Sequence, residues 1–261
     1  AAQGVHTGSA EIRIEIPADM DKSRMHSIRN HIAKAMEKLE TEDFQLEELH
    51  IAGEKCAALR VLQIVITVAG ETDQKERIAD ALMTARAGQD IVYAGWAGLE
   101  GMLRIIGEKE AELRERFTPA FIGQMKAYDS ELCGLSKIAV ADAMGVSVIR
   151  QVSRGGILAS LWDLAKDTEL GLNLDLKKIA VRQETIEVCE HFRLNPYQLA
   201  SGGSFLMLTE NGEALADALN QKGIQAAVIG QLTDSNDKVI HNGEDMRYID
   251  RPAPDELMKV F

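Results

Sequence analysis

Two adjacent glycines stand where a strand pattern changes into a helix pattern, in the run Ser153-Arg154-Gly155-Gly156. β-Branched residues precede this turn, and apolar residues at helical spacing follow it. Paired glycines let the backbone approach a ligand closely, and the first N–H groups of a helix suit an anion. The turn therefore predicts a phosphate or carboxylate contact. The alternative is that the glycines only let the helix pack tightly on a sheet.

The composition is that of a globular protein with room for two unequal domains. The chain has 261 residues, of which 46% are hydrophobic and 27% charged, and its net charge is −12. The negative charge argues against nucleic acid and anionic membranes as partners, and no apolar run is long enough to span a bilayer. No signal peptide opens the sequence, so we expect a cytoplasmic protein.

Potential metal ligands are scattered along the sequence. Cys56, Cys133 and Cys189 form no CxxC or similar spacing, and they are typical of buried thiols in a reducing compartment. Of the six histidines, His26 and His31 are five apart on one predicted helix, which is not the i, i+4 placement of a metal pair. We expect no metal site built by the protein alone.

The first 70 residues predict a β-α-β-β order. Residues 11–16 alternate between polar and apolar, and residues 21–39 carry an apolar stripe at helical spacing. A strand over residues 46–53 is expected to end in a turn at Gly53-Glu54-Lys55. Residues 59–68 are almost continuously apolar, which favours a strand buried on both faces. Polar residues at 70–90 mark a domain boundary, with domains at 1–85 and 88–261.

The second domain alternates strands and helices, with antiparallel hairpins among them. We expect an α+β fold with a mixed or antiparallel sheet and helices on one of its faces. A helix interrupted near Gly134 fills residues 120–144, and Thr118 is expected to cap it. The dipeptide Asn242-Gly243 predicts a hairpin turn. The strands are expected at residues 91–93, 146–149, 171–176, 204–208 and 226–232, and further helices at 108–117, 157–165, 183–192 and 212–222.

Four segments of the second domain occur in the order found in the aminoimidazole ribonucleotide (AIR) synthase, or PurM-like, superfamily. They are DIVYAGWAGLEGM, SVIRQVSRGGILASLWDLAKDTELGLNLDLKKIAVRQET, NPYQLASGGSFLM and AAVIGQLTD. The sequence resembles the hydrogenase maturation factor (HypE-type) branch most, through AGLEG, the glycine pair before its helix and the NPYQLASG segment. The similarity covers roughly residues 90–249 and is specific as an ordered set.

The resemblance implies ATP and Mg²⁺ as cofactors, a homodimer formed by the first domain, and a small molecule or a maturation protein as partner. The first domain resembles only the latter part of the superfamily's N-terminal domain. The segment with an acidic pair that binds magnesium and nucleotide has no counterpart here. We expect either a fragment of a longer protein or a shortened paralogue, and in both cases an incomplete nucleotide site.

The resemblance also assigns cofactor-binding residues. Gly53, Glu54 and Lys55 are similar to a glycine-acid-threonine turn, although Lys55 replaces the threonine and is as well explained as a solvated lysine. The turn at residues 153–156 is similar to Thr-Arg-Gly-Gly, which makes Arg154, Gly155 and Gly156 candidates and Arg154 an anion contact.

A third turn, Ser201-Gly202-Gly203, is similar to one that faces the same cleft in the superfamily. Two acidic positions differ. The superfamily's Asp-Pro before the arginine turn is Gln151-Val152 here, and Gly202 leaves no acid or thiol where the superfamily often has one. Glu100, between two glycines, is expected to cap its own helix rather than bind a ligand.

Two functions therefore stay open. The first is an AIR synthase-related, hydrogenase-maturation-factor-like protein from a superfamily that activates an amide or acyl oxygen with ATP. The second is a catalytically silent dimeric scaffold or small-anion-binding paralogue. No cysteine follows Cys189, whereas the hydrogenase factor ends in the cysteine that carries its carboxamide, and this argues against nitrile synthesis by this chain.

Overall fold

The computed structural model describes residues 7–37, 45–60, 62–70, 82–146 and 148–261. The chain forms two compact units, Ala1–Lys75 and Glu76–Phe261.

The first unit is a three-stranded sheet with one helix. Its elements are β1 (Thr7–Pro17), α1 (Lys22–Glu37), β2 (Gln45–Cys56) and β3 (Gln63–Ala69), in the sheet order β2-β1-β3. β1 runs parallel to β2 and antiparallel to β3. The predicted β-α-β-β order is confirmed, and the last two positions of the predicted helix lie outside the described residues.

The core of the first unit lies between β1 and α1. Ile12, Ile14 and Ile16 alternate with polar residues, and all three are fully buried. Met25, Ile28, Ile32 and Met36 of α1 pack on them. Their spacing puts one face of the helix on one face of the strand, as the apolar stripe predicted.

β3 corrects the prediction of a strand buried on both faces. Every residue of β3 is exposed, and Ile66 and Val68 keep 58% and 59% of their surfaces accessible. The strand lies at the edge of the sheet, and α1 contacts β1 and β2 instead. The prediction of a strand is therefore confirmed, and the prediction that both of its faces are buried is wrong.

The expected turn at Gly53-Glu54-Lys55 is also wrong. These residues continue β2 to Cys56, and they pair with Ile14, Glu15 and Ile16 of β1. The parallel partner is long enough to hold the strand extended through the glycine, so the chain turns only after Cys56.

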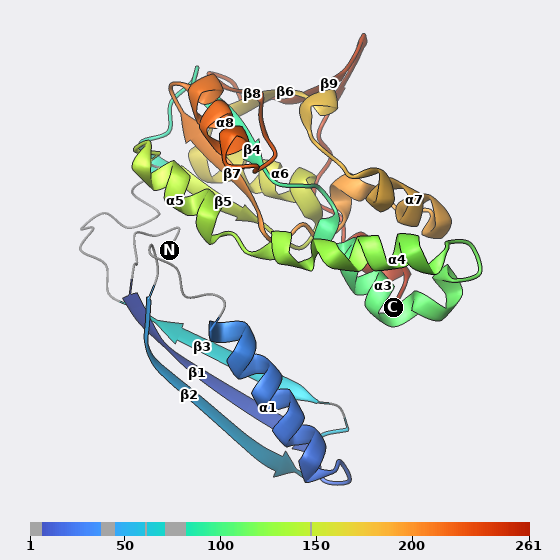
Figure 1. Cartoon of the computed structure of the whole chain (residues 1–261). Helices are drawn as coiled ribbons and strands as arrows, with labels where there is room; N and C mark the ends of the chain where they lie inside the picture. Colours follow the sequence, from blue (N-terminus) through green and yellow to red (C-terminus); the bar gives the residue numbers. More distant parts are fainter. Residues whose placement is uncertain (1–6, 38–44, 61, 71–81, 147) are drawn as a thin grey trace. The chain divides into compact units, whose positions relative to one another are not determined.

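The second unit is built on a seven-stranded sheet of order β10-β9-β6-β8-β4-β7-β5 (Figure 1). Its neighbouring strands are antiparallel except for the pair β6 and β9, so the predicted mixed sheet is confirmed. The strands are β4 (Asp90–Ala94), β5 (Val148–Val152), β6 (Gly171–Asp175), β7 (Ser204–Thr209), β8 (Ala226–Thr233), β9 (Lys238–Asn242) and β10 (Asp245–Tyr248).

The helices of the second unit match the predicted segments with a few differences. They are α3 (Leu99–Leu113), α4 (Pro119–Lys126), α5 (Leu135–Ala143), α6 (Gly156–Thr168), α7 (Gln183–Phe192) and α8 (Gly212–Gln221), and the 3₁₀ segments are η1 (Ala127–Leu132), η2 (Leu176–Lys178), η3 (Pro196–Gln198) and η4 (Glu256–Lys259). The Thr118 hydroxyl accepts the Phe121 N–H as a cap, and the break near Gly134 separates η1 from α5. The helix predicted over residues 108–117 is instead the second half of α3, which begins at Leu99 and is kinked at Lys109.

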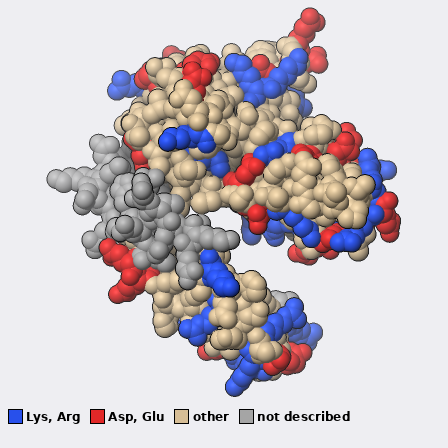
Figure 2. Space-filling model, in the orientation of Figure 1, with Lys and Arg blue, Asp and Glu red and all other residues tan. Residues whose placement is uncertain are grey.

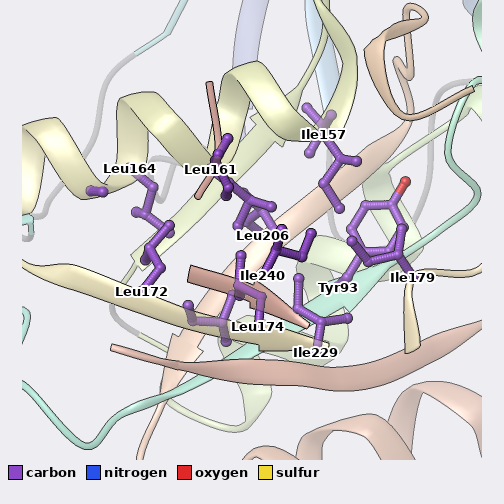
Figure 3. Close-up of a cluster of buried hydrophobic side chains, with 14 of the residues drawn as sticks. Tyr93, Ile157, Leu161, Leu164, Leu172, Leu174, Ile179, Leu206, Ile229 and Ile240 are labelled. Atoms are coloured by element: carbon purple, nitrogen blue, oxygen red, sulfur yellow. The ribbon is translucent and has the colours of Figure 1, made fainter. Parts of the chain in front are cut away.

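Helices cover both faces of the large sheet, which corrects the expectation of one. Ile157, Leu161 and Leu164 of α6 pack on one face, where they meet the Tyr93 ring of β4 and Leu206 of β7 (Figure 3). α8 contacts β4 and β8 and lies on the other face (Figures 1 and 3). Residues 91–94 of β4 are all buried, although successive side chains of a strand point to opposite faces of the sheet. The strand is therefore covered from both sides.

The thiols differ from one another. Cys189 is buried, and burial raises its pKa to about 12, as expected of an inert core thiol. Cys56 and Cys133 are only partly buried, so the prediction of three buried thiols holds for one of them. Within the described residues, no helix is both long and apolar enough to cross a membrane.

Charges of both signs mix on the surface of the second unit, as Figure 2 shows over α3 and α4. Glu110 pairs there with Arg114 at 2.7 Å and with Lys126 at 2.5 Å. Hydrogen bonds from both cations hold the pKa of Glu110 below its ordinary value. Such exposed pairs contribute little to stability.

Candidate functional site

Two turns of the second unit meet at the start of α6. One joins β5 to α6 through Ser153 and Arg154, and the other leads into β7 through residues 201–203. The Ser153 carbonyl accepts hydrogen bonds from the Gly156 N–H at 3.2 Å and from the Ser201 N–H at 3.3 Å. One backbone oxygen therefore ties the two turns together, although they are about fifty residues apart in sequence.

An open hollow of about 460 Å³ lies where the turns meet. It is lined by Glu100, Leu132, Gln151, Ser153, Arg154, Gly202 and Gly203. Three residues predicted as a site, Arg154, Gly202 and Gly203, are thus brought to one place. The volume suffices for a small metabolite but is at the low end for a whole cofactor.

The polar lining of the hollow offers both donors and acceptors. Ser153, Arg154 and Gln151 are exposed, and within the described part of the chain no ion pair engages the Arg154 guanidinium. An unpaired guanidinium presents five N–H donors in a fork that fits a carboxylate or phosphate. The hollow therefore carries one cation free to meet an oxyanion.

The adjacent glycines differ in role. Both have left-handed backbone angles, with φ of 77° at Gly155 and 66° at Gly156. A Cβ on Gly156 would lie 2.5 Å from the Tyr197 carbonyl oxygen, so this glycine serves close packing of α6 on η3. The Gly155 N–H donates to the Asp255 carboxylate at 2.7 Å. A carboxylate of the same chain therefore holds one N–H at the helix start that was expected to meet a ligand.

Ser201 braces its turn from behind. The side chain is fully buried, its Oγ accepts the Gly98 N–H at 2.7 Å, and its hydroxyl donates to the Leu199 carbonyl at 2.8 Å. It is therefore absent from the lining of the hollow, and its hydrogen bonds fix the position of Gly202.

Gly203 is fixed by a contact that leaves no room for a side chain. Its φ is 83°, and a Cβ there would lie 2.5 Å from the Leu132 carbonyl oxygen. The neighbouring carbonyls of Glu131 and Cys133 accept from the Lys137 Nζ at 3.0 and 3.3 Å. Desolvation by burial lowers the pKa of Lys137. This buried lysine therefore fixes residues 131–133, whose backbone packs against Gly203.

Glu100 is the residue that sequence reasoning missed. Its Oε2 accepts the Gly202 N–H at 2.9 Å, and its Oε1 lies 3.9 Å from the Arg104 guanidinium. The expected cap of its own helix is wrong, because the Gly98 N–H donates to the Ser201 Oγ and the Glu100 carboxylate faces Gly202 and Arg104 instead. Gly202 could have indicated this contact. It stands where the superfamily often has an acid, and a glycine there leaves space for a carboxylate from another segment of the chain.

The predicted residues of the first unit lie within a strand. A Cβ on Gly53 would lie 2.8 Å from the Met25 sulfur, so the glycine admits a side chain of α1. The Lys55 Nζ donates to the Ala18 carbonyl at 2.9 Å. Both contacts are within the unit, while Glu54 is exposed. A role of these residues in binding a cofactor stays a prediction.

Comparison with known proteins places the second unit in a family. Residues 86–242 match the family described as AIR synthase related protein, C-terminal domain. The carbamoyl dehydratase HypE of Rhizobium leguminosarum is 26% identical over 153 residues, which are 57% of this chain and 41% of that protein. A putative hydrogenase expression/formation protein of Methanocaldococcus jannaschii is 22% identical over 236 residues, which are 88% of this chain and 68% of that protein. The chain thus spans less than half of the first relative.

Solved structures share the fold at low identity. The hydrogenase maturation protein HypE of E. coli gives a TM-score of 0.71 at 17% identity, over 99% of this chain and 77% of that one. A HypE in complex with ATP gives 0.68 at 16%, over 98% and 76%. A HypE–HypF complex gives 0.69 at 18%, over 96% and 79%. The resemblance in fold that the ordered segments predicted is confirmed.

Proposed function

The chain belongs to the family of AIR synthase related proteins, and on that premise we propose that it is a hydrogenase-maturation-factor-like protein that binds a small metabolite in the hollow of its second unit. The ligand carries an oxyanion, which Arg154 and Ser153 receive. In the reaction class that the family resemblance implies, ATP activates an amide or acyl oxygen of such a metabolite.

One observation carries the proposal. Arg154, Gly202 and Gly203 come from two turns far apart in sequence, and they line one hollow in which no described carboxylate pairs with the Arg154 guanidinium. The Ser153 carbonyl and the buried Ser201 hold both turns in place before any ligand arrives. The backbone positions that carry Arg154, Gly202 and Gly203 are therefore fixed, which lowers the ordering cost of ligand binding at the turns.

The described residues fit the oxyanion of a nucleotide better than its Mg²⁺. Mg²⁺ is commonly bound through one or two carboxylates together with substrate phosphates. Among the described residues that line the hollow, Glu100 is the only carboxylate, and one of its oxygens already accepts from Gly202. Gln151 contributes an amide where the resemblance places an acid. We therefore propose that this chain by itself holds an incomplete nucleotide site, although a HypE relative of similar fold binds ATP.

The second candidate is a catalytically silent paralogue that uses the same hollow for a small anion. The exposed Gln151 favours it, because an amide cannot serve as a magnesium carboxylate or a general base. Both candidates require anion binding at Arg154, and saturable Mg-ATP binding would favour the first over the second.

Calorimetric titration of the 261-residue chain separates these statements. Inorganic phosphate should bind to the wild type, and Arg154→Gln should weaken it by about tenfold or more, because a charge-assisted pair is lost. Arg116→Gln, which removes an exposed arginine paired with Glu187 instead, should leave it unchanged. Equal binding by wild type and Arg154→Gln would contradict the site. Saturable Mg-ATP binding would contradict the incomplete nucleotide site and favour the ATP-dependent candidate.

We also propose a homodimer formed by the first unit. The apolar side chains of Ile64, Ile66 and Val68 lie on the α1 side of β3 and remain 41–59% exposed. An uncovered apolar edge strand is a hazard unless a partner covers it. We propose that a second copy of this chain covers this strand. We also propose a maturation protein as a further partner and the cytoplasm as the location.

A further inference from the structure

A second cavity of the second unit is distinct from the hollow. Its volume is about 140 Å³, and its lining comes from the first turn of α6, the η3 segment and the chain around and after β10. We refer to residues 249–253 of this lining as the strap, and to the cavity as the strap cavity. Gly155 lines the strap cavity, whereas its neighbour Arg154 lines the hollow. Adjacent residues of one turn therefore border two different cavities.

Arg247 projects into the space between β10 and α6. In the antiparallel register it lies directly opposite Ile240 of β9, and side chains of directly opposite residues point to the same face of a sheet. Ile240 is buried and belongs to one core cluster with Leu161 and Leu164 of α6. The Arg247 side chain therefore leaves the sheet on the face that α6 covers, where it lines the strap cavity together with Ile240.

A second observation places the charge of Arg247 near η3. Burial raises the pKa of the Tyr197 phenol, and the positive charge of Arg247 opposes that rise. Tyr197 lies in sequence between Asn195 and Gln198, and both of these line the strap cavity. The guanidinium is thus directed toward the wall that η3 forms.

The strap is held at both ends. At its start the Ile249 N–H donates to the Lys238 carbonyl at 2.8 Å. Just beyond its end the Asp255 Oδ2 accepts the Gly155 N–H at 2.7 Å, and both oxygens of this carboxylate are engaged by backbone N–H groups. Arg251, in the middle of this short segment, therefore stays beside the cavity that it lines. A fixed backbone lowers the ordering cost of binding a ligand there.

The lining carries more positive than negative charge. Arg247 and Arg251 both line the strap cavity, and within the described part of the chain no ion pair engages either of them. Asp250, which is exposed, is the one carboxylate of this lining. Two guanidinium groups on one small cavity repel each other, and an anion between them offsets that repulsion. The Gln198 amide can donate a further N–H.

The size of the cavity sets the class of ligand. Pockets for drug-sized ligands commonly have about 300–1,000 Å³, so the strap cavity suits an ion better than a nucleotide. We propose that the strap cavity is a second anion site, in which Arg247 and Arg251 bind a free oxyanion of the size of phosphate. Each guanidinium supplies a fork of N–H donors that matches two oxygens of such an ion. The strap cavity and the hollow share no lining residue, so this site is independent of the proposed function.

Titration of a ¹⁵N-labelled chain with inorganic phosphate tests the site, because amide shifts report on the two cavities separately. In the wild type the amides of Asn195 and Ala253 should shift in a saturable manner, with a dissociation constant of about 1 mM or tighter. Arg247→Gln and Arg251→Gln should each weaken this binding about tenfold, because each removes a charge-assisted contact. The shift of Gly203, in the hollow, should persist in both variants.

Asp250 provides a test of opposite sign. Asp250→Asn removes the one carboxylate of the lining and should tighten phosphate binding about threefold. Glu244→Gln makes the same change of charge in the turn between β9 and β10, outside the lining, and should leave the affinity unchanged. Arg154→Gln should weaken binding in the hollow and leave the strap cavity unaffected. A fluorescence melt verifies that each variant is folded.

Calorimetry sums the two cavities, so the effect of Arg154→Gln on the hollow is measured there in the double variant Arg247→Gln with Arg251→Gln. This background removes phosphate binding in the strap cavity and keeps the lining of the hollow.

The outcomes separate the inference from the proposed function. Absence of saturable shifts at the strap cavity, a dissociation constant above about 10 mM, or shifts that survive both arginine substitutions would overturn the inference and leave the proposed function intact. Equal effects of Asp250→Asn and Glu244→Gln would also overturn it, because binding would then follow the net charge and not the lining. Saturable shifts at the strap cavity with none in the hollow would support the inference and overturn the proposed function.

Discussion

Two apolar strands, β3 of the first unit and β7 of the second, differ in how far their side chains are buried. Each residue of β3 is exposed, whereas the first five of six in β7 are buried. β7 lies between β4 and β5 within the large sheet, and β3 lies at the edge of the small sheet, where α1 packs mainly on β1 and β2. The comparison teaches that an apolar run predicts the need for cover, while the cover itself depends on elements distant in sequence.

The largest effect is expected in the core that covers β7. Leu161→Ala removes a fully buried side chain of α6 that packs with Leu206, and it should destabilise the second unit by about 2–5 kcal/mol. Trp96 and Trp162, the two tryptophans of the chain, are both in the second unit, so tryptophan fluorescence in a urea titration reports on it. A loss below about 1 kcal/mol would contradict the packing of α6 on the sheet.

A smaller effect is expected at Lys137, which braces the wall of the hollow. Lys137→Met removes the donors to two carbonyls and should cost about 1–3 kcal/mol at pH 7. Because burial lowers the pKa of Lys137, the unfolded chain binds this proton more tightly than the folded chain. Wild-type stability should therefore rise with pH from the lowered pKa up to the ordinary 10.5, with the penalty fully present below that window.

Urea titrations of both proteins at several pH values between 8 and 10.5 measure this slope. The Lys137→Met variant should lack the contribution of one proton, so its disadvantage against the wild type should grow with pH. Parallel pH profiles of wild type and variant would contradict the lowered pKa.

The smallest effect on stability is expected at β3. Ile66→Ser should change the unfolding free energy of the monomer by less than about 0.5 kcal/mol, because the side chain is already largely exposed. It should shift the dimer proposed for this chain toward monomer in light scattering at micromolar concentration. Val65→Ser, on the opposite face of the same strand and 42% exposed, is the control and should leave the dimer intact. A monomeric wild type would contradict the dimer.

Periodicity predicted most elements of the second unit because it reports local constraints. The bounds of α7 were predicted to the residue, and those of β7 and α8 to within one, since apolar spacing and flanking turns lie within the segment itself. The turn at Gly53 was wrong for the converse reason. Its extended form depends on pairing with β1, some forty residues earlier.

The candidate site was half predictable. The sequence indicates Arg154, Gly202 and Gly203 because the turns that carry them resemble those of the superfamily, and the structure brings the three to one hollow, where their role in binding stays a prediction. Glu100 was assigned to its own helix, because nothing near it shows that its carboxylate crosses to Gly202. Asp255, which takes the Gly155 N–H, lies a hundred residues from its partner and was missed for the same reason. Side-chain contacts across the fold are a product of tertiary structure, which local patterns do not encode.

The central claim, that the second unit and not the strand of the first holds the ligand site, can be tested by mapping backbone amide shifts. A ¹⁵N-labelled chain is titrated with phosphate and its two predicted sites are compared. The amides of Ser153, Arg154 and Gly203 should shift in a saturable manner, and those of Gly53, Glu54 and Lys55 should not. Saturable shifts confined to residues 53–55, or no shifts at the two turns, would contradict the account.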